Sequence, residues 1–259
     1  MAAPARPSPN DQPRRLGGQT GARVWELATP LGEWVLKRAD PAQVAREADM
    51  LAQLAGSGLA PELVAAGEGI LITGRVDGAP RPAASWNADQ AGAVGGLLAL
   101  VHRRPAPAPV EGAPASRGRL IADIRRDCRP GLRAITAAAI AALPSPEPGA
   151  RVLLHGDPWS ANIVWSAAGP VLVDWEYTRG GEPAEDLAYL AALDELSDAT
   201  LAEVLRGYGA DLALAARVRA WRPLMATWCG SWLCDRGAGD RGARLVAHAE
   251  RLLLHGAGQ

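Results

Sequence analysis

Apolar and polar residues alternate in the first third of the chain, which predicts short β-strands. The predicted strands cover residues 23–29, 33–38, 63–66 and 70–73. A helix is expected over residues 41–55, because Asp40 can cap its N-terminus and Pro41 suits the first helical position. Residues 15–75 are therefore predicted to form a small, strand-rich part of the molecule.

Helical periodicity dominates the remainder, residues 76–259, apart from one group of short strands. The expected helices cover residues 87–104, 119–143 (with a break near 130) and most of 183–259. The expected strands cover residues 151–155, 162–165 and 170–174. Residues 1–14 are rich in Pro and Arg and are expected to be a disordered tail. We therefore predict an α+β, bilobal chain with a small β-rich N-lobe and a larger, mainly helical C-lobe.

The charge balance argues against a nucleic-acid-binding protein. The chain has 27 basic and 28 acidic residues and a formal net charge of −1, so it lacks a basic footprint. No apolar run approaches the roughly 18 residues of a membrane span, and the first 15 residues lack the apolar core of a signal peptide. The three scattered cysteines fit free thiols in a reducing compartment. We expect a cytoplasmic protein without nucleic-acid or membrane partners, and the oligomeric state stays open.

Lysine usage singles out one position. The chain contains 26 arginines but a single lysine, Lys37, at the end of a predicted strand. A compact ammonium differs in size and geometry from a planar guanidinium, so Lys37 is a candidate for a site that needs the former. Glu47 lies at the edge of the apolar stripe of the predicted helix 41–55, where a carboxylate needs a cation to offset its desolvation. Lys37 is the candidate partner; an ordinary surface lysine and a solvated glutamate are the plainer alternatives.

The most informative segment runs from His155-Gly156-Asp157 to Asn162, with Asp174 twelve residues further on. The strands around it are expected to bring the side-chain oxygens of Asp157, Asn162 and Asp174 to one sheet edge. Hard oxygen ligands suit Mg²⁺, and a carboxylate can orient a hydroxyl group and accept its proton. Phosphoryl transfer needs both the metal ligands and such a carboxylate. The alternative interpretation is that these are three unrelated polar residues in turns.

These residues resemble the aminoglycoside phosphotransferase and choline kinase family, small-molecule relatives of the protein kinases. The resemblance covers about residues 15–189 and implies a protein-kinase-like fold with ATP and Mg²⁺ as cofactors. It implies Asp157 as the catalytic base or hydroxyl-orienting residue, and Asn162 and Asp174 as Mg²⁺ ligands. Protein kinases carry Arg and Phe-Gly where this chain has Gly156 and Trp175-Glu176, which favours a small-molecule acceptor.

The same resemblance assigns the nucleotide-binding residues. Lys37 would contact the α- and β-phosphates and pair with Glu47. The carbonyl of Gly74 and the amide of Val76 would bind adenine through the backbone. The glycine-rich residues 16–21 are either a phosphate-covering loop or a hairpin turn.

The expected function is ATP- and Mg²⁺-dependent transfer of the γ-phosphate to a hydroxyl of a small molecule. An aromatic stripe is either core or a wall for a cationic alcohol such as an aminoglycoside, choline or a thiamine-like compound. The stripe comprises Trp221, Met225, Trp228 and Trp232, and the acidic residues considered with it are Glu176, Asp194, Glu195 and Asp198. A neutral sugar or homoserine remains open. The alternative function is a non-catalytic, pseudokinase-like nucleotide-binding module.

Overall fold

The structure is a computed structural model that describes residues 13–17, 22–30, 32–107, 116–146 and 151–256. It divides into two compact units. The first comprises Met1–Ala79 and Val164–Glu176, and the second Pro80–Ile163 and Tyr177–Gln259. Most of the predicted tail, and residues 18–21 of the glycine-rich segment, lie outside the described residues.

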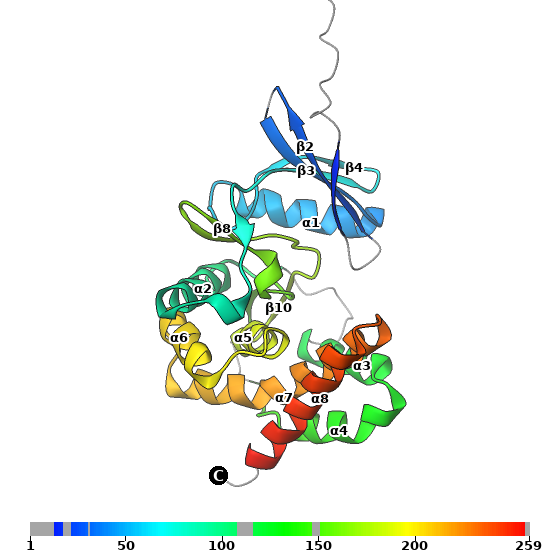
Figure 1. Cartoon of the computed structure of the whole chain (residues 1–259), viewed down its shortest axis with the longest axis vertical. Coiled ribbons are helices and arrows are strands. Elements are labelled where there is room, and N and C mark those ends of the chain that lie inside the picture. Colours follow the sequence, from blue (N-terminus) through cyan, green and yellow to red (C-terminus); the bar gives the residue numbers. More distant parts are fainter. Residues whose placement is uncertain (1–12, 18–21, 31, 108–115, 147–150, 257–259) are drawn as a thin grey trace, which may run out of the picture. The chain divides into compact units, whose positions relative to one another are not determined.

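The first unit contains a β-sheet next to helix α1 (Figure 1). The strands of this sheet are antiparallel and follow the order β1-β2-β3-β5-β4. Its strands are β1 (Arg14–Gly17), β2 (Arg23–Thr29), β3 (Gly32–Arg38), β4 (Leu63–Gly67) and β5 (Ile70–Gly74). Helix α1 (Pro41–Leu54) packs against β4 and β5, and the Asp40 side chain accepts hydrogen bonds from the amides of Ala42 and Gln43 at its start. Val44, Leu51 and Leu54 on its inner face are buried with Leu71 of β5.

A segment from much later in the sequence belongs to this first unit. Strands β6 (Ala79–Pro80), β8 (Ile163–Ser166) and β9 (Gly169–Leu172) form a small sheet in the order β6-β8-β9. The amide of Leu172 donates a 3.0 Å hydrogen bond to the carbonyl of Leu59. Residues 173–176, which follow β9, therefore lie next to α1, although the two segments are far apart in the sequence. The Trp175 amide donates a hydrogen bond to the side chain of Glu47 on α1.

The second unit is mainly helical (Figure 1). Its helices are α2 (Ala88–His102), α3 (Ser116–Asp127), α4 (Arg133–Ala141), α5 (Pro183–Leu193), α6 (Asp198–Tyr208), α7 (Leu212–Asp235) and α8 (Gly239–Gly256), with 3₁₀ turns η2 (Ala83–Ser85), η3 (Pro130–Leu132) and η4 (Ser160–Asn162). Strands β7 (Val152–Leu154) and β10 (Arg179–Gly181) pair antiparallel. Leu187, Leu190 and Ala191 of α5 are fully buried, and α5 packs against α7 and β7, so α5 is a central element of this unit.

The predicted fold class is confirmed: a strand-rich part precedes a mainly helical one. The predicted break in helix 119–143 is also observed, at η3. The chain after Pro183 contains a further break, at residues 194–197, where no Gly or Pro marked it in the sequence. No described helix is both long enough and apolar enough to cross a bilayer.

Candidate functional site

Lys37 is the centre of a buried ion-pair network in the first unit. It lies on β3 between Val24 of β2 and Leu71 of β5 and is 7% exposed. Its Nζ donates hydrogen bonds to Glu47 Oε2 at 2.8 Å, Asp174 Oδ1 at 2.5 Å and Glu176 Oε2 at 2.6 Å. The contact between Lys37 and Glu47 that the sequence suggested is therefore present. Lys37 also binds two further carboxylates, those of Asp174 and Glu176.

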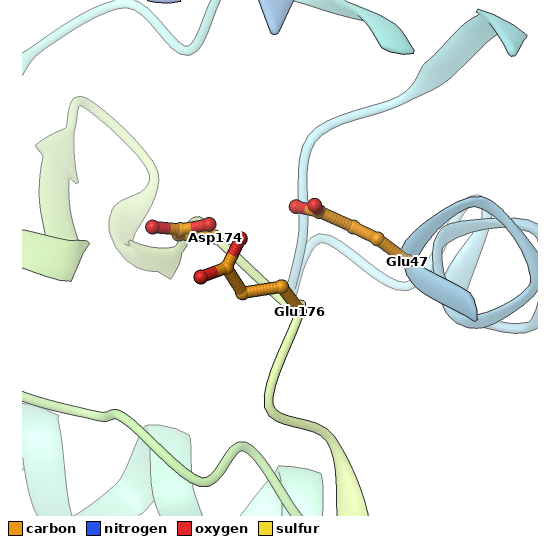
Figure 2. Close-up of side chains that lie close together, drawn as sticks. All are labelled: Glu47, Asp174 and Glu176. Atoms are coloured by element: carbon orange, nitrogen blue, oxygen red, sulfur yellow. The ribbon is translucent and has the colours of Figure 1, made fainter. Parts of the chain in front are cut away.

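The three carboxylates come from two remote segments and point toward one another (Figure 2). Glu47 projects from α1, whereas Asp174 and Glu176 follow β9. One oxygen or more of each lies within 4.8 Å of the others. With every group ionised, a single ammonium faces three negative charges, which leaves an excess of two. A divalent cation that prefers oxygen ligands, such as Mg²⁺, matches both this charge and this donor set.

Burial shapes the ionisation of this cluster. Desolvation raises the pKa of Glu47, and the charge of Asp174 adds to it, although Lys37 opposes both. Desolvation alone would lower the pKa of Lys37, but the charges of Asp174 and Glu47 outweigh it and hold that pKa well above its ordinary value. Lys37 is thus a permanent cation. The backbone of Asp174 is left-handed, with φ 67°, a sparsely populated conformation that is frequent at functional sites.

Asp157 lies in the second unit, in the loop between β7 and η4. Asn162 Nδ2 donates to both the carbonyl oxygen and Oδ2 of Asp157, each at 2.9 Å. The Asp157 amide donates to His155 Nδ1 at 3.2 Å. Burial, together with the charge of the nearby Asp157 carboxylate, raises the pKa of Tyr189 on α5 well above its ordinary value. Asp157 is therefore held by several partners rather than by the loop backbone alone.

Asp186, in the first turn of α5, braces the start of this loop. It accepts hydrogen bonds from the amides of His155 (2.8 Å) and Gly156 (3.0 Å) and contacts His102 Nε2 at 3.2 Å. Gly156 has φ +86°, and a Cβ there would lie 2.3 Å from the Tyr177 carbonyl oxygen. The glycine of the His-Gly-Asp motif is thus required by backbone conformation and by space.

The predicted site residues fall into two groups. Lys37, Glu47 and Asp174 meet in the first unit, and Asp157 meets Asn162 in the second. The convergence of both groups on one metal ion stays a prediction, as do the catalytic and ligand roles of these residues.

The two residues predicted to bind adenine lie at the end of the sheet and just beyond it. Gly74 ends β5, opposite Trp34 of β3, and its amide donates to the Glu62 carbonyl at 2.8 Å. Val76 follows two residues later and is partly buried. The adenine contacts of Gly74 and Val76 stay predictions.

Sequence reasoning missed three contacts. Glu176 was considered for the acceptor wall, but it binds Lys37. Tyr189 lies near Asp157, and Asp194 binds Ser160 of the loop formed by residues 155–162. The sequence carried no local signal for the Glu176 contact, because Asp174 has a left-handed backbone and Glu176 lies in a turn, so the alternation of an extended strand does not apply to this segment.

The aromatic stripe on α7 is largely core. Trp221 and Met225 are completely buried. The guanidinium of Arg117 lies 5.2 Å from the ring centroid of Trp221, and that of Arg236 lies 4.6 Å from the ring of Trp232. Core packing, the plainer alternative, therefore accounts for Trp221 and Met225.

Comparison with known proteins gives one family and many similar folds. A model of the phosphotransferase enzyme family APH matches residues 13–222, whereas no curated protein sequence matches the chain. A choline kinase from Streptococcus pneumoniae is 18% identical, with 94% of this chain and 93% of that chain covered and a TM-score of 0.72. A thermostable mutant of an aminoglycoside phosphotransferase, in complex with AMP-PNP and hygromycin B, is 17% identical (96% and 95% covered, TM-score 0.73). A macrolide 2′-phosphotransferase from Brachybacterium faecium is 22% identical (93% and 91% covered, TM-score 0.62).

Proposed function

Because the chain belongs to the APH phosphotransferase enzyme family, we propose that it transfers the γ-phosphate of ATP to a hydroxyl group of a small molecule, with Mg²⁺ as cofactor. The family confirms the sequence-based interpretation as a phosphotransferase, and the similar structures confirm the protein-kinase-like fold. The nucleotide, the metal and the acceptor are the parts that we propose.

The buried ammonium of Lys37 among three carboxylates carries the proposal for the nucleotide and the metal. Lys37 would bind the α- and β-phosphates while Glu47 holds it in place. Asp174 and Asn162 would hold Mg²⁺, and the two excess negative charges around Lys37 suit a divalent cation. When bound, Mg²⁺ neutralises charge on the phosphate oxygens. The AMP-PNP complex of the aminoglycoside phosphotransferase supports ATP as the nucleotide.

Asp157 would perform the chemistry. Its carboxylate would orient the acceptor hydroxyl and take its proton as the new O–P bond forms and the bond from the γ-phosphorus to the β–γ bridging oxygen breaks. The hydrogen bond from Asn162 Nδ2 to the Asp157 carboxylate supports this role, because it limits the orientations of that carboxylate. ADP is the leaving group.

The acceptor would be a small hydroxyl compound. Cationic alcohols such as choline, thiamine-like compounds and aminoglycosides remain candidates, since similar structures include a choline kinase and a phosphotransferase bound to hygromycin B. However, arginine side chains cover the rings of Trp232 and Trp159, the latter by Arg241 at 5.7 Å. Neutral sugars and homoserine therefore belong in the same test.

A non-catalytic nucleotide-binding module is the second candidate function. It has less support, because Lys37, Asp157, Asn162 and Asp174 are all present, whereas a module that has lost catalysis has no chemical need for them.

Acceptor-dependent ADP release from MgATP, measured with a panel of these alcohols, tests the proposal. We expect at least one acceptor to stimulate release, and Asp157→Asn to abolish the stimulation while MgATP still raises the melting temperature. Stimulation that persists in Asp157→Asn would contradict the role of Asp157. Thermal stabilisation by MgATP without stimulation by any acceptor would favour the non-catalytic module.

A further inference from the structure

Helix α5 holds the catalytic loop by an aspartate at each end. Asp186, in its first turn, binds the amides of His155 and Gly156 at the start of the loop. Asp194, the residue that caps its C-terminus, binds Ser160 near the end of the loop. The Ser160 amide donates to Asp194 Oδ2 at 2.7 Å, and its hydroxyl donates to Oδ1 at 2.5 Å. Both carboxylate oxygens of Asp194 are therefore engaged by one loop residue.

Asp194 occupies an unfavourable position for a carboxylate. The C-terminal end of a helix carries partial negative charge, so the helix dipole repels an anion there. Burial also raises the pKa of Asp194, which indicates that the charged form is desolvated. The nearby Arg241, which donates to the Leu193 carbonyl at 2.5 Å, offsets part of this penalty. A residue that breaks a local stability rule and makes two specific bonds to a functional loop indicates a role in function.

Hydrogen bonds connect Ser160, which Asp194 holds, to the proposed catalytic carboxylate of Asp157. Ser160 begins the 3₁₀ turn η4, which ends at Asn162, and the Asn162 amide donates to the Trp159 carbonyl at 2.9 Å. Asn162 in turn donates to the carbonyl oxygen and Oδ2 of Asp157. A turn that is held at its first residue keeps its last residue in place, so the orientation of Asn162, and through it of Asp157, depends on Asp194.

We propose that Asp194 is a positioning residue for phosphoryl transfer, which locks Ser160 so that Asn162 and Asp157 keep their reactive orientation. This inference rests on the proposed function. Asp194 acts through Ser160 and touches no reacting atom, which distinguishes it from an acceptor-binding carboxylate. If it bound the acceptor instead, its loss would chiefly raise the KM for the acceptor.

Asp194→Asn tests the proposal, because the amide keeps the size of the side chain but has one acceptor oxygen for two donors. We expect kcat to fall about 10–100-fold, as for other residues that support a functional group, with KM values for ATP and acceptor within about twofold of wild type. Ser160→Ala keeps the backbone bond, so its kcat should fall less. The double variant should be no slower than Asp194→Asn, because both changes remove the same contact.

The matched control is Asp127→Asn, which removes another aspartate at a helix C-terminus, with a half-exposed side chain bonded to Arg126. It should keep wild-type kcat. Wild-type kcat in Asp194→Asn, or a raised acceptor KM with unchanged kcat, would overturn the proposal. If Asp194→Asn does not unfold cooperatively, Ser160→Ala decides: a lowered kcat with unchanged KM supports the proposal, and wild-type kcat overturns it.

Hydrogen exchange separates this inference from the proposed function. Without any substrate, the amides of Asp157 and residues 159–162 should exchange faster in Asp194→Asn than in wild type, because the turn loses an anchor. If no acceptor supports turnover by the wild type, the proposed function fails. Faster amide exchange in Asp194→Asn would then still support the inference that Asp194 holds the loop in place. Unchanged amide exchange in Asp194→Asn would overturn the inference that Asp194 holds the loop in place through Ser160.

Discussion

The ammonium nitrogen of Lys37 lies 2.5 Å from Asp174 Oδ1, although 137 residues separate them in the sequence. The contact exists because the segment after β9 belongs to the same compact unit as the N-terminal sheet. One unit therefore contains both the proposed phosphate-binding lysine and the proposed metal-binding aspartate. Since Lys37 also binds Glu47 and Glu176, three acidic residues share its single positive charge.

Replacing Lys37 should destabilise the protein as well as inactivate it. Lys37→Met leaves Glu47, Asp174 and Glu176 without their shared cation, and breaking a buried ion pair from one side typically costs about 3–5 kcal/mol. We expect a loss of this size in the free energy of unfolding, measured with urea in the absence of nucleotide.

The neighbouring Arg38 provides the control for Lys37. It lies on the same strand with an exposed side chain. Arg38→Met should change the free energy of unfolding by less than about 0.5 kcal/mol, as is usual for surface positions. Equal losses in the two variants would show that the buried network contributes nothing specific.

Gly156→Ala should distort the loop of residues 155–162, which contains the proposed catalytic Asp157. The new Cβ would lie 2.3 Å from the Tyr177 carbonyl oxygen, and alanine disfavours the positive φ of this residue. We expect a loss of about 1–3 kcal/mol in stability and a lower kcat, since Asp157 is the next residue. The control is Gly131→Ala, where nothing lies within 4 Å of the new Cβ. A Gly156→Ala variant with wild-type stability and turnover would contradict the assigned geometry.

Local signals in the sequence predicted most elements and part of the site. Alternation of apolar and polar residues identified β2 and β3, and the Asp40-Pro41 pair correctly marked the start of α1. The solitary lysine and the amphipathic position of Glu47 indicated their contact. These features depend on residues close in sequence or on a strong charge requirement.

Other features depend on tertiary structure and left little local signal. Strand β1 has four residues and pairs with β2 through a bulge. The end of α5 at Leu193 has no Gly or Pro, because the turn is held by tertiary contacts such as that of Asp194 with Ser160. Asp194 could be assigned to the loop only once the two segments, 34 residues apart, were seen in contact.

The α2–α6 contact offers a test of close packing by two adjacent glycines. A Cβ on Gly95 would lie 1.9 Å from the Val204 carbonyl oxygen, so the helices would have to separate. We expect Gly95→Ala to lower the free energy of unfolding by about 1–3 kcal/mol, as overpacking usually does. A Cβ on Gly96 would lie 3.7 Å from the nearest atom, the Gly207 carbonyl oxygen. Gly96→Ala should therefore stabilise the protein by up to about 1 kcal/mol through helix propensity. Thermal unfolding that ranks the two variants in the opposite order would contradict this packing.

Asp186 should make stability depend on pH under acidic conditions. Burial by itself would raise the pKa of Asp186, but the hydrogen bond and charge of His102, with the charges of Arg179 and His155, hold the pKa below its ordinary value of 3.8. The unfolded chain therefore binds this proton at a higher pH than the folded protein does. The stabilisation is present above the ordinary value and is lost as pH falls through the lower, folded value.

Asp186→Asn should accordingly weaken the dependence of melting temperature on pH in the acidic range. It should also lower stability at neutral pH by about 1–3 kcal/mol, because one amide of the loop loses its acceptor. Asp89→Asn is the matched control, since Asp89 occupies the first turn of α2 with an exposed side chain. That variant should keep the wild-type slope. If Asp186→Asn and wild type lost stability in parallel on acidification, the ionised carboxylate of Asp186 would not be what holds the loop of residues 155–162 in place.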